Sequence, residues 1–186
     1  MKRIFDLLFS LILLILIIPL LIIIAIIITI FDGLPIFHWS KRIGKNCKIY
    51  LMPKFRTMNK NAPDVATHLL KNPKDYITKT GIYLRTYSLD ELPQIFSVLK
   101  GDMSLVGPRP ALYNQKDLIN LRIKKNIINF RPGVTGWAQI NGRDNLSAEE
   151  KSSLDKYYCD NSSLLFDIRI IFITIIRVIQ KVGISH

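Results

Sequence analysis

The sequence predicts a helix-rich α+β protein seated on a membrane, with an N-terminal re-entrant helix, a small β-hairpin and amphipathic helices in the membrane interface. Three observations lead to this fold class. Residues 7–31 form an uncharged apolar run, residues 45–58 are rich in β-branched and aromatic side chains, and later segments repeat apolar residues at helical spacing. We therefore expect a membrane anchor over residues 1–32 and a folded domain on the cytoplasmic face over residues 33–186.

The proline and the flanks of the apolar run favour a re-entrant helix. Pro19 lies near the middle of the run and should bend the helix, because proline lacks the backbone donor and clashes with the preceding turn. Each leg then has about 12 residues, or ~18 Å, close to one leaflet of the bilayer. Basic residues flank both ends, including Arg3 and Lys41, so the positive-inside rule favours both ends in the cytoplasm. A spanning helix is the alternative.

The segments that follow the anchor predict an exit turn and a hairpin. Residues 32–37 have turn chemistry, and residues 45–58 are expected to form an extended pair or hairpin. On a strand, Lys54 and Arg56 would point to one face.

Further along, the sequence predicts a loop and then helices. Residues 59–80 are polar and turn-rich, whereas residues 89–99 are expected to form a helix that Gly101 ends. Residues 116–130 place apolar residues at helical spacing opposite a basic face.

The last apolar segment, residues 164–182, is predicted to be an amphipathic helix. Asp167, Thr174, Arg177 and Lys181 lie roughly along one stripe of it. Such a helix can lie in the membrane interface. A buried core helix is the alternative.

The composition indicates an anionic partner. The 186 residues carry a formal charge of +12, which suits nucleic acid, acidic lipid or a phosphorylated substrate. Cys47 and Cys159 lack the spacing of a zinc site, and the three histidines show no metal-ligand pattern. We expect neither a structural disulfide nor a zinc centre, which fits a reducing, cytosolic environment.

An acidic pair, Asp90 and Glu91, stands out in this basic chain. One interpretation is structural, because Ser88 and Glu91 match a capping box at a helix start. Pro93 counts against it, since a proline there prevents a regular first turn. The other interpretation is that the pair does chemistry.

The surroundings favour chemistry on a phosphorylated compound. "GPRP" presents Arg109 between two prolines, and residues 130–144 offer Arg131 and Arg143 among glycine turns. Arginine forks and such turns suit phosphate groups. A carboxylate can attack phosphorus, and a second carboxylate can hold a divalent cation that shields the approach of one anion to another.

Three motifs resemble the bacterial sugar transferase family, the monotopic phosphoglycosyl transferases. They are "KFRTM", "LRTYSLDELPQIFSVLKGDMSLVGPRP" and "RPGVTGWAQINGR", and the resemblance runs in order over nearly the whole chain. It is similar to the short form of the family, which lacks a multi-helix N-terminal extension. Relatives often carry Ser-Pro at the helix bend, where this chain has Ile18-Pro19.

The resemblance implies an enzyme of the bacterial inner membrane, on its cytoplasmic face. Such enzymes move a sugar 1-phosphate from a UDP-sugar to polyprenyl phosphate, release UMP, and begin the synthesis of O-antigen, capsule or glycoprotein glycans. Downstream glycosyltransferases are then possible partners. The resemblance implies Asp90 as nucleophile, Glu91 beside it, and Mg²⁺ held by the two. We assign six basic residues to substrate phosphates: Lys54, Arg56, Arg85, Arg109, Arg131 and Arg143.

Three alternatives to this function remain. A nucleic-acid-binding protein would explain the charge but not the anchor, and no recognition motif is visible. A non-catalytic membrane scaffold would leave the acidic pair without a role. Within enzymes, polyprenyl phosphate could attack the UDP-sugar directly, with Asp90 only a metal ligand. The sequence does not identify the sugar, whose determinants we expect in two loops, residues 59–80 and 143–152.

Overall fold

A computed structural model describes residues 1–63, 73–142 and 145–180 and confirms a helix-rich α+β fold. The helices are α1 (Lys2–Phe31), α2 (Lys79–Thr86), α3 (Gln94–Lys100), α4 (Lys116–Lys124), α5 (Trp137–Ile140), α6 (Ala148–Asp160) and α7 (Leu164–Ile179). The strands are β1 (Phe37–Ile43), β2 (Ile49–Phe55), β3 (Ser104–Val106) and β4 (Gly133–Thr135). Short 3₁₀ turns cover Lys45–Cys47, Pro73–Tyr76, Leu89–Glu91 and Ile127–Asn129.

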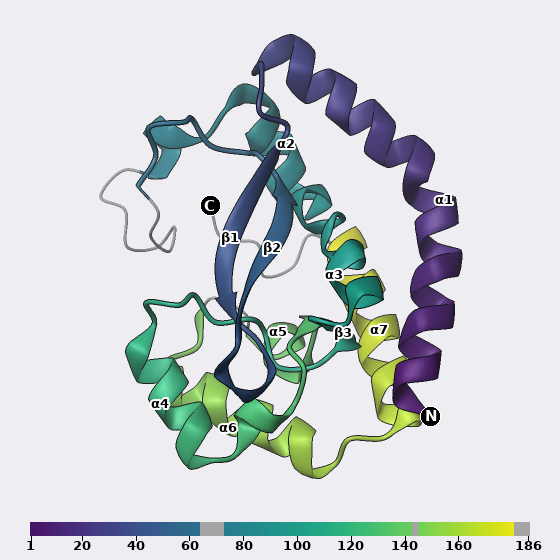
Figure 1. The fold of residues 1–186 in the computed structure, drawn as a ribbon, viewed down its shortest axis with the longest axis vertical. Coiled ribbons are helices and arrows are strands. Elements are labelled where there is room, and N and C mark those ends of the chain that lie inside the picture. The colour runs from purple at the N-terminus through teal and green to yellow at the C-terminus, as the bar shows by residue number, and fades with distance from the viewer. Residues whose placement is uncertain (64–72, 143–144, 181–186) are drawn as a thin grey trace.

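The long apolar helix α1 runs along one side of the molecule and is bent (Figure 1). Pro19 lies inside the helix, and the sequence predicts a bend there because proline is a common cause of helix bending. Within the described residues, α1 is the one helix long and apolar enough to cross a membrane, by length and composition. Most of its side chains remain exposed.

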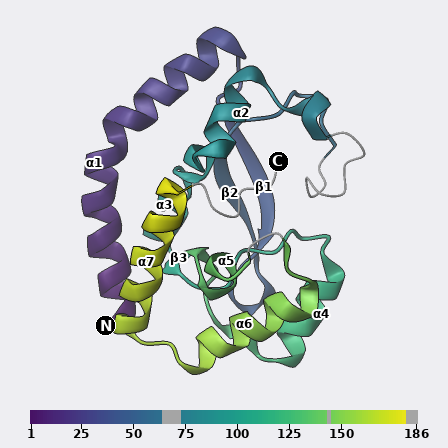
Figure 2. The ribbon, with the colours of Figure 1, turned by 180° about the vertical axis from the view of Figure 1, so that it is seen from behind.

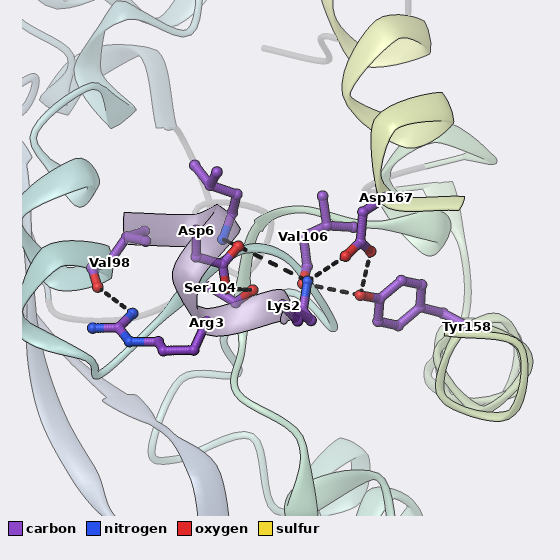
Figure 3. Close-up of polar contacts among 9 residues, drawn as sticks. Lys2, Arg3, Asp6, Val98, Ser104, Val106, Tyr158 and Asp167 are labelled. Atoms are coloured by element: carbon purple, nitrogen blue, oxygen red, sulfur yellow. Dashed lines mark hydrogen bonds and ion pairs between the residues drawn. The ribbon is translucent and has the colours of Figure 1, made fainter. Parts of the chain in front are cut away.

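Both ends of α1 contact the folded domain. At the N-terminal end, Lys2 and Asp6 join a polar network with β3, α6 and α7 (Figure 3). At the C-terminal end, Ile24 and Ile28 are buried in a cluster with Phe55. The anchor and the domain therefore pack as one unit.

The network at the start of α1 centres on two buried carboxylates. Asp6 accepts a hydrogen bond of 2.7 Å from the Ser104 hydroxyl. Asp167 accepts 2.5 Å and 2.7 Å bonds from Lys2 and from the Tyr158 hydroxyl (Figure 3). Because a buried carboxylate is costly unless it is paired and hydrogen-bonded, these contacts fix how α1 docks.

The two-stranded sheet confirms the expected hairpin but not its limits. β1 pairs with β2 in antiparallel register from Phe37↔Phe55 to Ile43↔Ile49. The prediction that the extended pair lies within residues 45–58 is wrong for the first strand, which occupies residues 37–43. Alternation of Phe37 and Trp39 with polar residues is the signal that was missed. Residues 45–47 form the connecting 3₁₀ turn.

A pair of short parallel strands organises the middle of the domain. β3 and β4 pair through Ser104↔Gly133 and Val106↔Thr135. A Cβ on Gly133 would lie 2.1 Å from the backbone nitrogen of Gly107, so only glycine allows this approach. The glycines of the GPRP and RPGVTG segments thus bring two backbones together.

The C-terminal helix α7 runs beside α1 (Figure 2). It is amphipathic, but its polar side packs on the folded domain. Its polar stripe faces the domain: Asp167 is buried, and the Thr174 hydroxyl lies 2.7 Å from that of Thr135. Its outer side is mostly apolar, with Leu165 81% and Phe172 64% exposed, and it also carries the exposed Arg169. Lys181 lies outside the described residues.

The main core lies where the hairpin, β3, α3, α6 and α7 meet. It contains Tyr50, Met52, Ile95, Val98, Met103, Leu105, Val106, Ile127, Ile140, Tyr158, Cys159 and Ile170. Cys47 and the buried Cys159 are both free thiols.

Two expectations about loops need correction. Residues 79 and 80, expected at the end of the 59–80 loop, begin α2, whose N-cap Thr78 accepts a bond from Gly81 N. Residues 148–152, expected within a second loop, form the start of α6. Residues 64–72 lie outside the described part of the chain.

Candidate active site

The acidic pair lies in a 3₁₀ turn, Leu89–Glu91, between α2 and α3. The interpretation of Ser88 and Glu91 as a capping box is wrong: Ser88 has a left-handed conformation (φ 54°) and makes no side-chain cap. The expected single helix over residues 89–99 is divided, because Pro93 starts α3 as its N-cap residue. Gly101 (φ 102°) ends α3 as predicted. The pair is therefore not explained by helix capping.

A capping box forms elsewhere in the chain. At the start of α6, the Ser147 hydroxyl accepts from Glu150 N, and the Glu150 carboxylate accepts from Ser147 N. The same sequence pattern thus has its structural role there but not at Ser88.

Glu91 is held by two cations from distant parts of the sequence. Its Oε1 accepts 2.7 Å and 2.9 Å bonds from Lys54 Nζ of β2 and Arg109 Nη2 of the loop after β3. The Glu91 and Lys54 side chains are only 13% and 15% exposed, so water screens the pair weakly. These contacts join the turn, the hairpin and the GPRP segment.

Asp90 is buried among charged neighbours. Burial raises the pKa of its carboxyl, and the negative charge of Glu91 also raises it, whereas Lys54, Arg85 and Arg109 oppose the rise. A carboxylate surrounded by three cations and shielded from water is a strong candidate for a functional group.

Arg85 completes the set of cations around the pair. Its Nε donates a 2.9 Å bond to the Thr57 hydroxyl, which orients the guanidinium. Burial lowers the pKa of Arg85, and Asp90 and Glu91 counteract this. Arginine remains charged under all ordinary conditions.

The other assigned cations have different surroundings. Arg56 is buried and donates to the main-chain carbonyls of Asp32 and Leu34 after α1, where it holds the link between anchor and hairpin. Arg131 Nε donates to the Gly101 carbonyl at 2.9 Å. Arg143 lies outside the described residues. The structure therefore gathers Lys54, Arg85 and Arg109 around the pair and engages Arg56 and Arg131 in main-chain contacts.

A buried ion pair that supports Arg109 is not evident from the sequence. Arg122 Nη2 lies 2.5 Å from Asp155 Oδ2, and Arg122 Nη1 donates 2.8 Å to the Arg109 carbonyl. Burial raises the pKa of Asp155, which Arg122 opposes. Because 33 positions separate the partners, no local pattern connects them.

The carboxylate pair fits a hard divalent cation bound together with a substrate. Within the described ranges, no group of three or more His, Cys, Asp or Glu side chains could hold a metal ion. Mg²⁺ is commonly bound by one or two carboxylates, substrate phosphates and water. Asp90 and Glu91, two neighbouring carboxylates with Lys54, Arg85 and Arg109 around them, fit that pattern.

Comparison with known proteins gives the family. The profile described as "Bacterial sugar transferase" matches residues 1–181. The chain is 39% identical to the "Uncharacterized sugar transferase EpsL" of Bacillus subtilis (strain 168), over 100% of this chain and 91% of the relative.

Two longer relatives have names that state a reaction. The "Undecaprenyl-phosphate galactose phosphotransferase" of Salmonella typhimurium is 36% identical over 98% of this chain and 41% of its own length. The "UDP-glucose:undecaprenyl-phosphate glucose-1-phosphate transferase" of Xanthomonas campestris pv. campestris is 40% identical over 79% of this chain and 32% of its own length. The profile match and the EpsL relative both cover nearly the whole chain, so this protein is a member of the bacterial sugar transferase family.

Proposed function

We propose that this protein transfers a sugar 1-phosphate from a UDP-sugar to polyprenyl phosphate, releasing UMP and forming a polyprenyl-diphosphate sugar. The observation that carries the proposal is a buried Asp90 beside Glu91, with Lys54, Arg85 and Arg109 around them. The named reactions of the Salmonella and Xanthomonas relatives support the substrate classes.

In the first step, a carboxylate oxygen of Asp90 attacks the phosphorus that carries the sugar. A bond forms between this oxygen and phosphorus, the bond from phosphorus to the bridging oxygen breaks, and UMP leaves with the electron pair. The product is an acyl phosphate on Asp90. Lys54, Arg85 and Arg109 bind the phosphate oxygens, where charge accumulates as UMP leaves.

In the second step, an oxygen of polyprenyl phosphate attacks the same phosphorus. The new diphosphate bond forms, the acyl-phosphate bond breaks, and Asp90 becomes a free carboxylate again. Neither step requires a proton on Asp90, so the residue attacks and is released as a carboxylate anion.

Mg²⁺ fits the proposed reaction as a partner of Asp90 and Glu91. When bound, the ion would neutralise charge on the diphosphate of the UDP-sugar. Glu91 also positions Lys54 and Arg109 through its Oε1, so its role does not depend on the metal alone.

Direct attack by polyprenyl phosphate on the UDP-sugar is the competing route. The two differ in timing, because only the covalent route releases UMP before the lipid acceptor binds. Measuring UMP from enzyme and UDP-sugar without acceptor therefore tests the mechanism.

A re-entrant anchor is part of the proposal. Lys2 at one end of α1 and Ile28 near the other both contact the same folded domain. This supports two ends on one side of the membrane, and the basic flanks favour the cytoplasmic side. The exposed apolar side of α7, which lies beside α1 (Figure 2), would then rest in the interface. We place the protein on the cytoplasmic face of the bacterial inner membrane, where it would supply downstream glycosyltransferases.

A further inference from the structure

An apolar groove lies between the outer face of the hairpin and α3. Its volume is about 450 Å³, which is within the range of ligand sites in proteins. Most of its lining is apolar and comes from both elements: Phe37, Trp39, Leu51, Pro53, Pro93 and Phe96.

The groove adjoins the candidate active site through two short stretches of chain. Pro53, in the lining, directly precedes Lys54 on β2, so their side chains leave opposite faces of the strand, and Lys54 Nζ lies 2.7 Å from Glu91 Oε1. Pro93, also in the lining, follows Glu91 by two residues. A ligand with an anionic head at Asp90 and an apolar tail could therefore occupy both regions.

The groove also lies close to the membrane anchor. Helix α3, which forms one wall, packs on α1, where Arg3 donates to the Val98 carbonyl at 2.7 Å (Figure 3). Trp39 and Phe96 are 56% and 46% exposed. A cluster of exposed apolar side chains generally marks a site of interaction.

We propose that this groove binds the isoprenoid chain of the polyprenyl phosphate acceptor next to its phosphate. The inference rests on the proposed function, which requires an apolar chain to approach Asp90. The remainder of the chain would stay in the bilayer.

A matched pair of variants tests the groove. Leu51 lines it, and Ile49, two positions earlier on the outer face of the same strand, does not. Both side chains are aliphatic and 51% and 61% exposed, so Leu51→Gln and Ile49→Gln should fold equally well. Farnesyl phosphate, with three isoprene units, serves as the acceptor and dimethylallyl phosphate, with one unit, as the short comparison.

We expect Leu51→Gln to raise the KM for farnesyl phosphate about tenfold. An apolar side chain that the bound ligand buries typically changes a binding constant by roughly this factor. Ile49→Gln should keep the wild-type KM. The ratio of the KM for dimethylallyl phosphate to the KM for farnesyl phosphate should fall in Leu51→Gln and stay at the wild-type value in Ile49→Gln. Equal KM values in the two variants of an active enzyme would overturn the groove and leave the proposed function standing. If the wild type consumes no UDP-sugar, the proposed function fails and the groove assignment falls with it.

Photolabelling of the wild-type protein gives a second measurement that needs no variant. A farnesyl phosphate analogue with a benzophenone at the chain end should label peptides containing Trp39 or Phe96. Labelling only on the outer side of α7, for example at Phe172, would indicate general lipid contact and overturn the proposal. If the wild-type protein forms a dimer and Leu51→Gln abolishes it, the groove binds a second copy of the chain, and the proposal is overturned.

Discussion

The ammonium of Lys54 lies 2.7 Å from the carboxylate of Glu91, although 37 positions separate the two residues. The same oxygen accepts a bond from Arg109. Through Glu91, the hairpin and the GPRP segment are fixed around Asp90. The arrangement keeps two cations next to a buried carboxylate, which suits the proposed attack of Asp90 on a diphosphate.

The charges around Asp90 predict opposite pH shifts for two variants. Burial raises the pKa of Asp90, Lys54 lowers it and Glu91 raises it. Asp90 must be ionised to attack, so activity should fall as the pH drops through its pKa. Lys54→Met should move this acid limb of kcat/KM to higher pH, and Glu91→Gln should move it to lower pH. Shifts in the same direction would show that Asp90 does not control the limb.

Arg109 should be sensitive even to a conservative change. Its Nη2 bonds Glu91, and its carbonyl accepts from Arg122. Arg109→Lys keeps the charge but loses the planar fork that binds phosphate in two places. We expect kcat/KM to fall by about tenfold or more, the loss of one charge-assisted hydrogen bond, with an unchanged Tm. Wild-type kinetics would remove Arg109 from the site.

The docking of α1 should depend on Asp167. Asp167→Ala leaves Lys2 and the Tyr158 hydroxyl without this acceptor. Asp167 is buried but Lys2 is 38% exposed, so the loss of these bonds should cost about 2 kcal/mol, or about 6 °C in Tm for a chain of this size. Asp160→Ala is the control, because the Lys156–Asp160 pair is exposed and should cost less than about 1 kcal/mol. Equal Tm values for the two variants would mean that the network does not hold the anchor.

Pro19 should determine the topology of the anchor. In a background with Cys47 and Cys159 changed to Ser, a cysteine added at the N-terminus should resist an impermeant maleimide in intact cells. Pro19→Leu removes the cause of the bend and should increase labelling from outside, because the straight helix tends to span. Ready labelling of the unchanged anchor would mean that α1 spans the membrane.

The parts of the fold with a local signal were predictable. The run around Pro19, the stop at Gly101 and the apolar periodicity of α7 are each read within one segment. The first hairpin strand was missed because Phe37 was assigned to the exit turn. The orientation of α7 also required the structure, since its polar stripe binds the domain through Asp167.

The candidate site was predictable as a list of residue types but not as a geometry. The acidic pair and Arg109 stand out in the sequence, and Ser88 appeared to explain the pair as a cap. Its left-handed backbone removes that explanation. Arg122 and Asp155 had no signal, because an isolated Arg and an isolated Asp become a pair only when α4 packs on α6.

The most direct test is a single-turnover measurement on Asp90. Enzyme mixed with UDP-sugar and Mg²⁺, without lipid acceptor, should release about one UMP per active site in a burst, the expected signature of a covalent intermediate. The peptide that contains Asp90 should then carry the mass of a sugar phosphate.

Asp90→Asn keeps the shape of the side chain and should fold with an equal or higher Tm. Burial raises the pKa of Asp90 in the folded state, so ionisation costs stability as the pH rises through that pKa, and Asn avoids the cost. The variant should give neither burst nor adduct. A burst that persists in Asp90→Asn, or UMP that appears only when polyprenyl phosphate is present, would contradict the covalent mechanism.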